Sequence, residues 1–244
     1  MILVLFPGKT DKETYAKITG KLEEKKIGYR LRLASAHKSP KLVRKILQDE
    51  YELIITGAGL AAALPGVAAA ETIVPVIGVA CPGAFEALDA FLSIVQMPPG
   101  VPVLYTTAEN AAIEAEKILS KKEKTAIIGE GKAAERAKAQ LDEMGISYEI
   151  GDFAKDAVNI AFVGIGEETA QRKELVIYCA SGETKASDAE KFMKQASFGL
   201  WVGIGRGENA AIAAAQILGK KEALLESRKK FEEKCRKQDE EAND

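Results

Sequence analysis

The chain lacks an excess of positive charge, because 36 Asp and Glu residues outweigh its 34 Lys and Arg residues and leave a net charge of −2. A protein that neutralises a phosphate backbone needs surplus Lys and Arg, so nucleic acid is not an expected partner. Cysteine is scarce too: Cys81, Cys179 and Cys235 are far apart and form no C-x-x-C pair. This predicts neither a zinc site nor a disulfide framework, and it is typical of a protein of the reducing cytoplasm.

A long unbroken apolar run is also missing. Residues 53–70 and 90–108 are uncharged and long enough to cross a bilayer, but glycine and proline interrupt both. Since a membrane span requires continuous helix, we expect buried segments with turns and no membrane partner. The N-terminal sequence MILVLFPGKTDKE has no basic segment before its apolar run, so a signal peptide is not expected.

What the chain does contain is an alternation of short apolar runs with segments of helical spacing. The expected strands are Ile2–Phe6, Tyr29–Ala34, Leu53–Thr56, Pro75–Val79 and Pro102–Thr106. The expected helices are Asp11–Lys25, Lys41–Gln48, part of Ala61–Thr72, Glu86–Val95, Glu109–Leu119 and, near the end, Lys220–Lys237. This order predicts an α/β fold, with a parallel sheet between helices and a ligand site at the carboxyl ends of the strands.

The second half of the sequence resembles the first. Residues 109–123 match residues 208–222 at eleven of fifteen positions, and the segment around Leu22 matches that around Leu141. Such self-similarity predicts a tandem duplication. We expect one domain over residues 1–120, a second over 124–219, and a C-terminal helix and polar tail over 220–244, the tail fraying at its end.

Two strand-to-helix turns of the first half carry candidate site residues. His37 is the only histidine, follows an expected strand, and has a side chain suited to give and take a proton near neutral pH. In the other turn, the backbone amides after Pro7, from Gly8 to Asp11, and the Lys9 ammonium suit a phosphate. Asp11 could hold ribose hydroxyls. If these turns bind no ligand, His37 is an ordinary surface histidine. The turn after Pro7 is then only the capped start of a helix.

A third loop is rich in glycine and alanine. Gly57-Ala58-Gly59-Leu60-Ala61-Ala62 has the spacing G-x-G-x-x-A of a dinucleotide-binding turn. The acidic residue expected about 20 positions later is missing, because residues 76–79 are apolar. Tight packing of the backbone explains the two glycines equally well.

Three segments together resemble one enzyme family. The segments Ser35-Ala-His-Lys-Ser-Pro40, Gly57-Ala-Gly-Leu-Ala-Ala-Ala-Leu-Pro-Gly66 and Leu92-Ser-Ile-Val-Gln-Met-Pro-Pro-Gly-Val-Pro-Val103 are similar, in order and spacing, to motifs of the PurE family of purine biosynthesis. The resemblance covers most of residues 1–120. It implies flavodoxin-like three-layer domains and formation of 4-carboxy-5-aminoimidazole ribonucleotide. Family members form this product by moving a carboxylate from N5 (the mutase reaction) or by adding CO2 to aminoimidazole ribonucleotide (the carboxylase reaction).

The resemblance also implies roles for individual residues. His37 matches the catalytic histidine, and Lys38 the Arg or Lys on the substrate phosphate. The remaining substrate-binding positions are Gly8, Lys9, Thr10, Asp11, Ser35, Gly57, Ala58, Gly59 and Leu64. Ala63 stands where the family has a second histidine. The lack of this histidine and the presence of Lys38 are similar to the carboxylase branch. The glycine loop and the SIVQMP segment instead resemble the mutase branch. No metal or other cofactor is expected, because a histidine alone can move the proton that the reaction transfers.

The second half lacks these motifs. It contains no histidine, has Ala154-Lys155-Asp156 near the place of the Ser-Ala-His turn, and has acidic residues in Gly164-Ile-Gly-Glu-Glu168. We expect it to have no active site. Because family members are octamers with sites between subunits, a chain with two copies implies a homotetramer that acts as a pseudo-octamer.

Three alternatives from other classes remain. An NAD-dependent oxidoreductase would use Gly57–Ala62, although the acidic residue is missing. A non-catalytic nucleotide sensor could consist of two degenerate copies, against which the intact motifs of the first half argue. A PurE-like pyridinium carboxylase would have its catalytic half at the C-terminus, whereas the motifs here are N-terminal.

Overall fold

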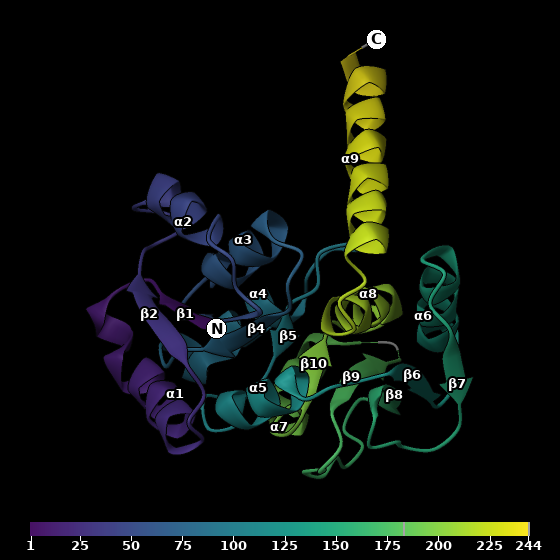
Figure 1. Ribbon diagram of the computed structural model, residues 1–244, viewed down its shortest axis with the longest axis horizontal. Coiled ribbons are helices and arrows are strands. Elements are labelled where there is room, and N and C mark those ends of the chain that lie inside the picture. Colours follow the sequence, from purple (N-terminus) through teal and green to yellow (C-terminus); the bar gives the residue numbers. More distant parts are fainter. Residues whose placement is uncertain (183, 244) are drawn as a thin grey trace.

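The computed structural model describes residues 1–182 and 184–243 (Figure 1). Strands and helices alternate in the first half, whereas the second half contains three successive strands without an α-helix between them. The first half contains β1 (Ile2–Phe6), α1 (Lys12–Glu24), β2 (Tyr29–Leu33), α2 (Pro40–Leu47), β3 (Leu53–Ala58), α3 (Ala63–Glu71), β4 (Val76–Ala80), α4 (Leu88–Val95), β5 (Leu104–Tyr105) and α5 (Ala111–Leu119). The second contains β6 (Lys124–Ile128), α6 (Lys132–Glu143), β7 (Tyr148–Ile150), β8 (Ala157–Gly164), β9 (Val176–Ser181), α7 (Ala189–Gln195), β10 (Leu200–Val202), α8 (Gly207–Ile217) and α9 (Lys221–Asn243). None of the described helices has the length and apolarity that a membrane crossing requires.

The ten strands of the described residues form one sheet in the order β2-β1-β3-β4-β5-β10-β9-β8-β6-β7. Within each half all pairs are parallel and the order is the same, because β6 to β10 are the first to fifth strands of the second half. The halves meet through β5 and β10, which pair antiparallel at Tyr105 and Trp201. The expected α/β fold with a mostly parallel sheet is therefore confirmed, and one sheet continues through both halves.

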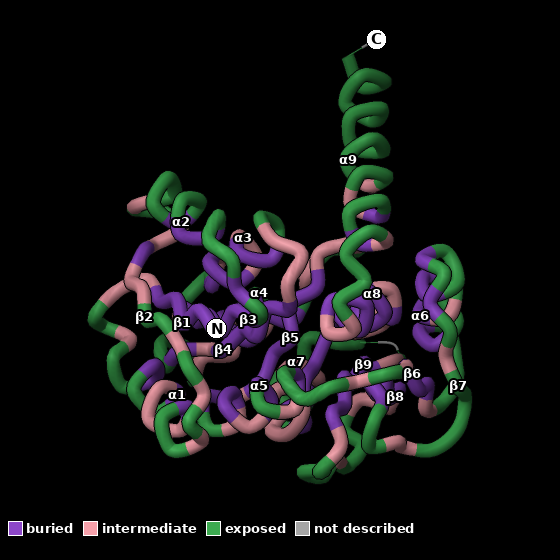
Figure 2. The backbone as a smooth tube through the Cα atoms, viewed as in Figure 1, coloured by how far each residue is buried: buried purple, intermediate pink, exposed green. Residues whose placement is uncertain are grey.

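The apolar strands of the first half separate two cores. In β1 the side chains of Ile2, Val4 and Phe6 face one core, and those of Leu3 and Leu5 face the other. A continuous apolar run is therefore needed, as is typical of a parallel strand covered on both faces. Figure 2 shows the buried strands between helices whose outer surfaces are exposed.

Equivalent hydrogen bonds end the first helix of each half. The amide of Ile27 donates to the carbonyl of Leu22 at 2.9 Å, and the amide of Ile146 donates to the carbonyl of Leu141 at 2.9 Å. In both halves the second strand begins two residues later. The matching residues of the two sequence segments therefore occupy matching places in the fold.

The two halves differ after their second and third strands. Where the first half has α2 and α3, the second has loops over residues 151–156 and 165–175. These loops contact each other, since the Arg172 guanidinium lies 3.6 Å from the centre of the Phe153 ring. The second half therefore has the same strands as the first half, but loops take the place of the helices that follow β2 and β3.

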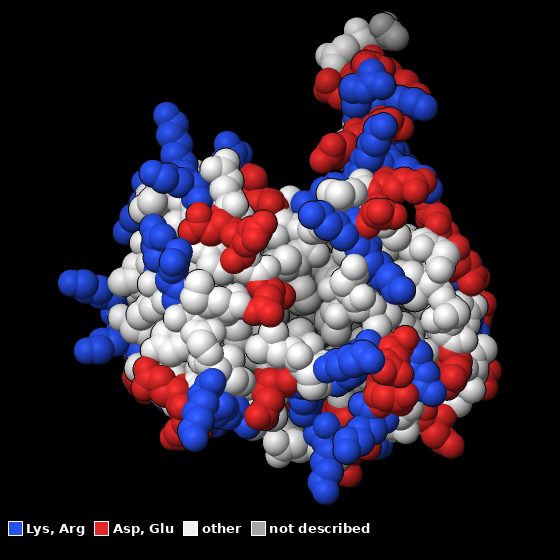
Figure 3. Space-filling view, viewed as in Figure 1, with Lys and Arg blue, Asp and Glu red and all other residues white. Residues whose placement is uncertain are grey.

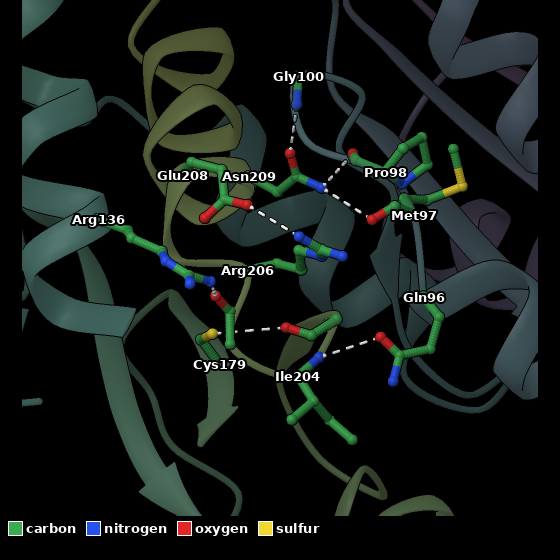
Figure 4. A network of polar contacts seen from close by, with 12 residues as sticks. Gln96, Met97, Pro98, Gly100, Arg136, Cys179, Ile204, Arg206, Glu208 and Asn209 are labelled. Atoms are coloured by element: carbon green, nitrogen blue, oxygen red, sulfur yellow. Dashed lines mark hydrogen bonds and ion pairs between the residues drawn. The ribbon is translucent and has the colours of Figure 1, made fainter. Parts of the chain in front are cut away.

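Side-chain amides join the halves in both directions. Asn209 donates to the carbonyl of Pro98 at 2.9 Å and accepts from the amide of Gly100 at 2.9 Å (Figure 4). In the opposite direction, Asn110 donates to the carbonyl of Ser197 at 2.7 Å. Since Asn110 and Asn209 occupy the same place in the matching segments, each half binds the other with the same residue.

A cluster of buried aromatic rings crosses the same junction. Phe91 of α4 makes edge contacts with Tyr105 and with Phe192 of α7, at ring-centre distances of 4.7 and 5.1 Å. Trp201 stacks on Tyr178 at 4.8 Å and contacts Phe192 at 5.7 Å. Edge and offset contacts of this kind stabilise aromatic pairs beyond the burial of their area.

Helix α9 rests on both halves and then projects from the body (Figure 1). Arg228 donates to the carbonyls of Ala69 and Thr72 at 2.9 and 2.6 Å, and Lys230 pairs with Glu143 at 3.1 Å. A helix is present where one was expected over 220–237, and it continues to Asn243.

The close contact between α6 and α8 gives a test of the fold. A Cβ atom on Gly207 would lie 1.8 Å from the carbonyl oxygen of Ala133, so the helices cannot approach in this way with a larger residue. We expect Gly207→Ala to lower the free energy of unfolding by about 1–3 kcal/mol in urea titrations. The control is Gly20→Ala in α1, where no atom lies within 4 Å and stability should rise by about 1 kcal/mol. Equal stabilities of the two variants would contradict this packing.

Candidate functional site

A cavity of about 500 Å³ opens at the carboxyl ends of β1, β2, β3 and β4. Its wall consists of Pro7, Thr10, Asp11, Ser35, Ala36, His37, Lys38, Ala58, Gly59, Leu60, Ala61, Ala63, Leu64, Pro82 and Gly83. The volume is within the range of small-molecule sites, which is about 300–1,000 Å³. Most of the site residues expected from the sequence therefore lie around one cavity, at the edge of the sheet where α/β folds bind ligands.

The turn after β2 presents His37 and Lys38. Ser35 accepts a hydrogen bond from the amide of Lys38 at 3.2 Å, and its own amide donates to Ser39 Oγ at 3.0 Å. Pro40 then occupies the first position of α2, where a residue without an amide hydrogen is well accommodated. These bonds fix the backbone of the turn, while both the His37 and Lys38 side chains remain exposed at the cavity wall.

The turn after β1 supplies Thr10 and Asp11. These residues end a short 3₁₀ turn, Lys9–Asp11, which leads into α1. Burial, with a contribution from the Asp11 carboxylate, raises the pKa of the Cys81 thiol to about 12, so this thiol stays neutral. Gly8 and Lys9 belong to the turn but do not line the cavity.

Gly57 has a packing role. A Cβ atom there would lie 2.5 Å from the Phe6 ring and 2.8 Å from the carbonyl oxygen of Val79. Gly57 lies within β3 and outside the cavity wall, and α3 begins only at Ala63. In a dinucleotide-binding turn the first glycine forms the tight turn itself, so this geometry does not favour an NAD site.

Sequence reasoning missed the residues after β4. Pro82 and Gly83 line the cavity, and Leu60, which has a φ of +57°, projects from the neighbouring loop with 65% of its surface exposed. The rule that ligands bind at the carboxyl ends of strands could have predicted Pro82 and Gly83, because they lie a few residues after an expected strand.

The corresponding loop of the second half is held by its own side chains. Gln195 donates to the carbonyls of Gly164 and Glu167 at 2.8 and 3.0 Å and accepts from the amide of Gly166 at 3.0 Å. A Cβ atom on Gly164 would lie 2.7 Å from a carboxylate oxygen of Glu167. The acidic side chain of Glu167 therefore covers Gly164, in the loop that corresponds to the glycine loop of the first half.

Comparison with known proteins identifies relatives of the first half. Residues 1–130 match the family model described as AIR carboxylase. The N5-carboxyaminoimidazole ribonucleotide mutase of Methanocaldococcus jannaschii is 42% identical over 127 residues, which cover 50% of this chain and 81% of that protein. The Bacillus subtilis enzyme of the same name is 38% identical over 130 residues, covering 49% and 80%.

One solved structure is also similar to part of the chain. The crystal structure of Treponema denticola PurE is 29% identical with a TM-score of 0.45, and covers 49% of this chain and 79% of that one. The family match extends over more than half of the 244 residues and includes every residue of the His37 cavity. The chain therefore belongs to the AIR carboxylase family.

Proposed function

We propose that the chain is an N5-carboxyaminoimidazole ribonucleotide mutase of purine biosynthesis, an isomerase. The observation that carries the proposal is the arrangement of His37, Lys38, Ser35 and Asp11 around one cavity, in a segment with relatives of that name. The substrate is a ribonucleotide, and no partner macromolecule is required for its conversion.

His37 is the proton shuttle of the proposed reaction. When the bond between N5 and the carboxylate carbon breaks, its electron pair returns to N5, and the imidazolium form of His37 donates a proton to that nitrogen. The CO2 that is released stays in the cavity and is attacked by C4 of the imidazole. Neutral His37 then accepts the C4 proton as aromaticity returns, so the histidine ends in its starting form. The small side chains of Ala58, Gly59 and Ala63 leave space for CO2.

The other wall residues bind the ribonucleotide. Lys38 contacts the phosphate, because its ammonium is exposed at the cavity wall and has no ion-pair partner among the described residues. Thr10, Asp11 and Ser35 offer acceptors and donors for ribose hydroxyls and phosphate oxygens. Gly8 and Lys9 lie outside the cavity wall. They contribute to phosphate binding through the backbone amides of the turn and the charge of Lys9.

A direct carboxylase is the second candidate, and one observation favours it. Ala63 lines the cavity where the resemblance implies a histidine in the mutase branch. The deciding experiment is turnover of N5-carboxyaminoimidazole ribonucleotide, compared with turnover of aminoimidazole ribonucleotide plus bicarbonate. If aminoimidazole ribonucleotide plus bicarbonate is turned over faster, the chain is a carboxylase and the mutase assignment is wrong.

The second half is proposed to be a degenerate copy that arose by duplication and performs no chemistry. The equal strand order, the equivalent helix ends and the paired asparagines support a common origin. The loop that Gln195 closes over Glu167 and Gly164 supports the loss of the site. Four such chains assemble as a homotetramer, in which half of the subunit contacts are already tethered.

The first variant tests proton transfer. Replacing His37 with Asn removes the group that gives and takes the proton, so we expect kcat to fall by at least about 100-fold. Product binding, measured by calorimetry, should stay within about twofold, since phosphate and ribose are bound by other residues. A kcat similar to that of the original protein would exclude His37 as the shuttle.

The second variant tests the phosphate contact. Lys38→Ala should raise KM by roughly ten- to a hundredfold with little change in kcat, because a charged contact that is equal in the ground and transition states is lost. Lys41→Ala is the matched control, since this lysine lies on α2 and does not line the cavity. A fall in kcat at unchanged KM would give Lys38 a different role.

The number of sites tests the role of the second half. Calorimetric titration with product should give one site per chain, and light scattering should give the mass of four chains. Two equivalent sites per chain, or a stable monomer, would contradict the degenerate copy or the tetramer respectively.

A further inference from the structure

The turn after β6, the first strand of the second half, has a regular spacing of small residues. Gly129, Gly131 and Ala134 form the pattern G-x-G-x-x-A between β6 and α6. In this place, after a strand and at the start of a helix, the pattern is typical of a turn that holds the diphosphate of a nucleotide. The corresponding turn of the first half, after β1, lines the His37 cavity.

Each of the three small residues has the role that such a turn requires. A Cβ atom on Gly129, which has a φ of +93°, would lie 2.9 Å from the carbonyl oxygen of Phe162, so the tight turn needs glycine. Gly131 has a φ of +109°, and beyond its chain neighbours no atom lies within 4 Å of its Cβ position, so a phosphate can approach the backbone closely. Ala134 is buried, where a small residue lets the helix pack against the sheet.

The start of α6 offers free donors and positive charge. The amide of Glu135 makes the first helical bond, to the carbonyl of Gly131 at 3.0 Å, so the amides of residues 132–134 have no intrahelical acceptor. The exposed Lys132 forms no ion pair with any described residue. Arg136, one turn later, donates to the carbonyl of Gly205 at 3.0 Å (Figure 4). Amides and cations at a helix start are suited to a phosphate.

A carboxylate lies where such a turn requires one for the ribose. β7 pairs with β6 in parallel, with Ile150 opposite Ile127, so Asp152 is level with Gly129 at the carboxyl ends of the two strands. It follows the glycines by about the 20 residues at which an acidic side chain binds ribose hydroxyls. Asp152 is exposed and forms no ion pair with any of the described residues.

The place in the sheet also suits a ligand. β6 has β7 on one side and β8 on the other, so the order of the strands changes direction there, and open α/β sheets bind ligands at such a point. Acidic and basic side chains are mixed on the side of the molecule that α6 and β7 form, at the right of Figure 3, so no uniform negative field repels an anion. Within the turn itself, the exposed Glu130 opposes an anion.

We propose that the turn after β6 binds a nucleotide through its 5′-diphosphate and its ribose. The diphosphate accepts hydrogen bonds from the amides at the start of α6 and contacts Lys132, and the ribose hydroxyls donate to the Asp152 carboxylate. ADP, ADP-ribose and NAD share this group. A 2′-phosphate would be repelled by the carboxylate, so NADP is excluded. The site lies in the second half and does not depend on the proposed isomerase activity.

Calorimetric titration of the full chain with ADP tests the diphosphate contact. We expect one saturable site per chain, with AMP bound at least about tenfold more weakly, because it lacks the second phosphate. Gly131→Ala places a methyl group where the diphosphate approaches and should weaken ADP binding at least about tenfold. Gly145→Ala is the matched control, since this glycine also has a positive φ and open space around its Cβ position, and binding should not change. Glu130→Gln should strengthen binding.

The ribose contact has a separate readout. The original protein should bind ADP about tenfold more tightly than 2′-deoxy-ADP, whereas Asp152→Ala should bind the two equally, because the hydroxyl has lost its acceptor. Asp142→Ala removes an exposed carboxylate near the other end of α6 and should keep the preference. Titrations with ADP-ribose and NAD show which carrier of the shared group binds best.

One further variant locates the bound ADP. Lys38→Ala changes the His37 cavity and should leave ADP binding unchanged. Absence of saturable ADP binding would overturn the proposal, as would NADP binding as tight as that of NAD. The same holds if Lys38→Ala removes ADP binding while Gly131→Ala and Asp152→Ala do not.

Discussion

The pairing of β5 with β10 is the constraint on which the arrangement of the molecule depends. It makes one sheet from two five-stranded halves, and it joins them at strands of only two and three residues. So short a ladder needs support from side chains, and the rings of Phe91, Phe192 and Trp201 supply it on one face. Asn110 and Asn209 add reciprocal hydrogen bonds at the turns before these strands. The junction therefore has the symmetry of an interface between two subunits, although one chain forms it.

The same constraint separates the two ends of the first half. The carboxyl ends of its strands form the cavity that His37 lines, whereas the residues just before β3 and β4, Glu52 and Pro75, lie close to the second half and the start of α9. The second half packs α6 against α8 and has loops where the first half has α2 and α3. Gly207 permits the close contact between these two helices.

The first half could be predicted from the sequence in most respects, because β1, β3 and β4 are apolar runs close to glycine or proline, and β2 alternates apolar with charged residues. β1 was predicted with its observed ends, and the turn with His37 followed from its position after β2. The single sheet could not be predicted, since β5 and β10 are short and their pairing joins residues far apart in the chain. The role of Gly57 was also hidden, because a glycine beside Phe6 and one beside a ligand look alike in sequence.

The position of β5 also has a consequence for synthesis on the ribosome. Leu104 leaves the ribosome well before Leu200, the first residue of its neighbouring strand, so the first half emerges with β5 as an unpaired edge. At roughly 5–20 residues per second, that edge stays open for on the order of ten seconds. An open edge can pair with another chain, and two nascent chains on one messenger present identical edges. Because β5 is so short, it offers few backbone groups for pairing with another chain. The short strand therefore protects the nascent protein from mispairing.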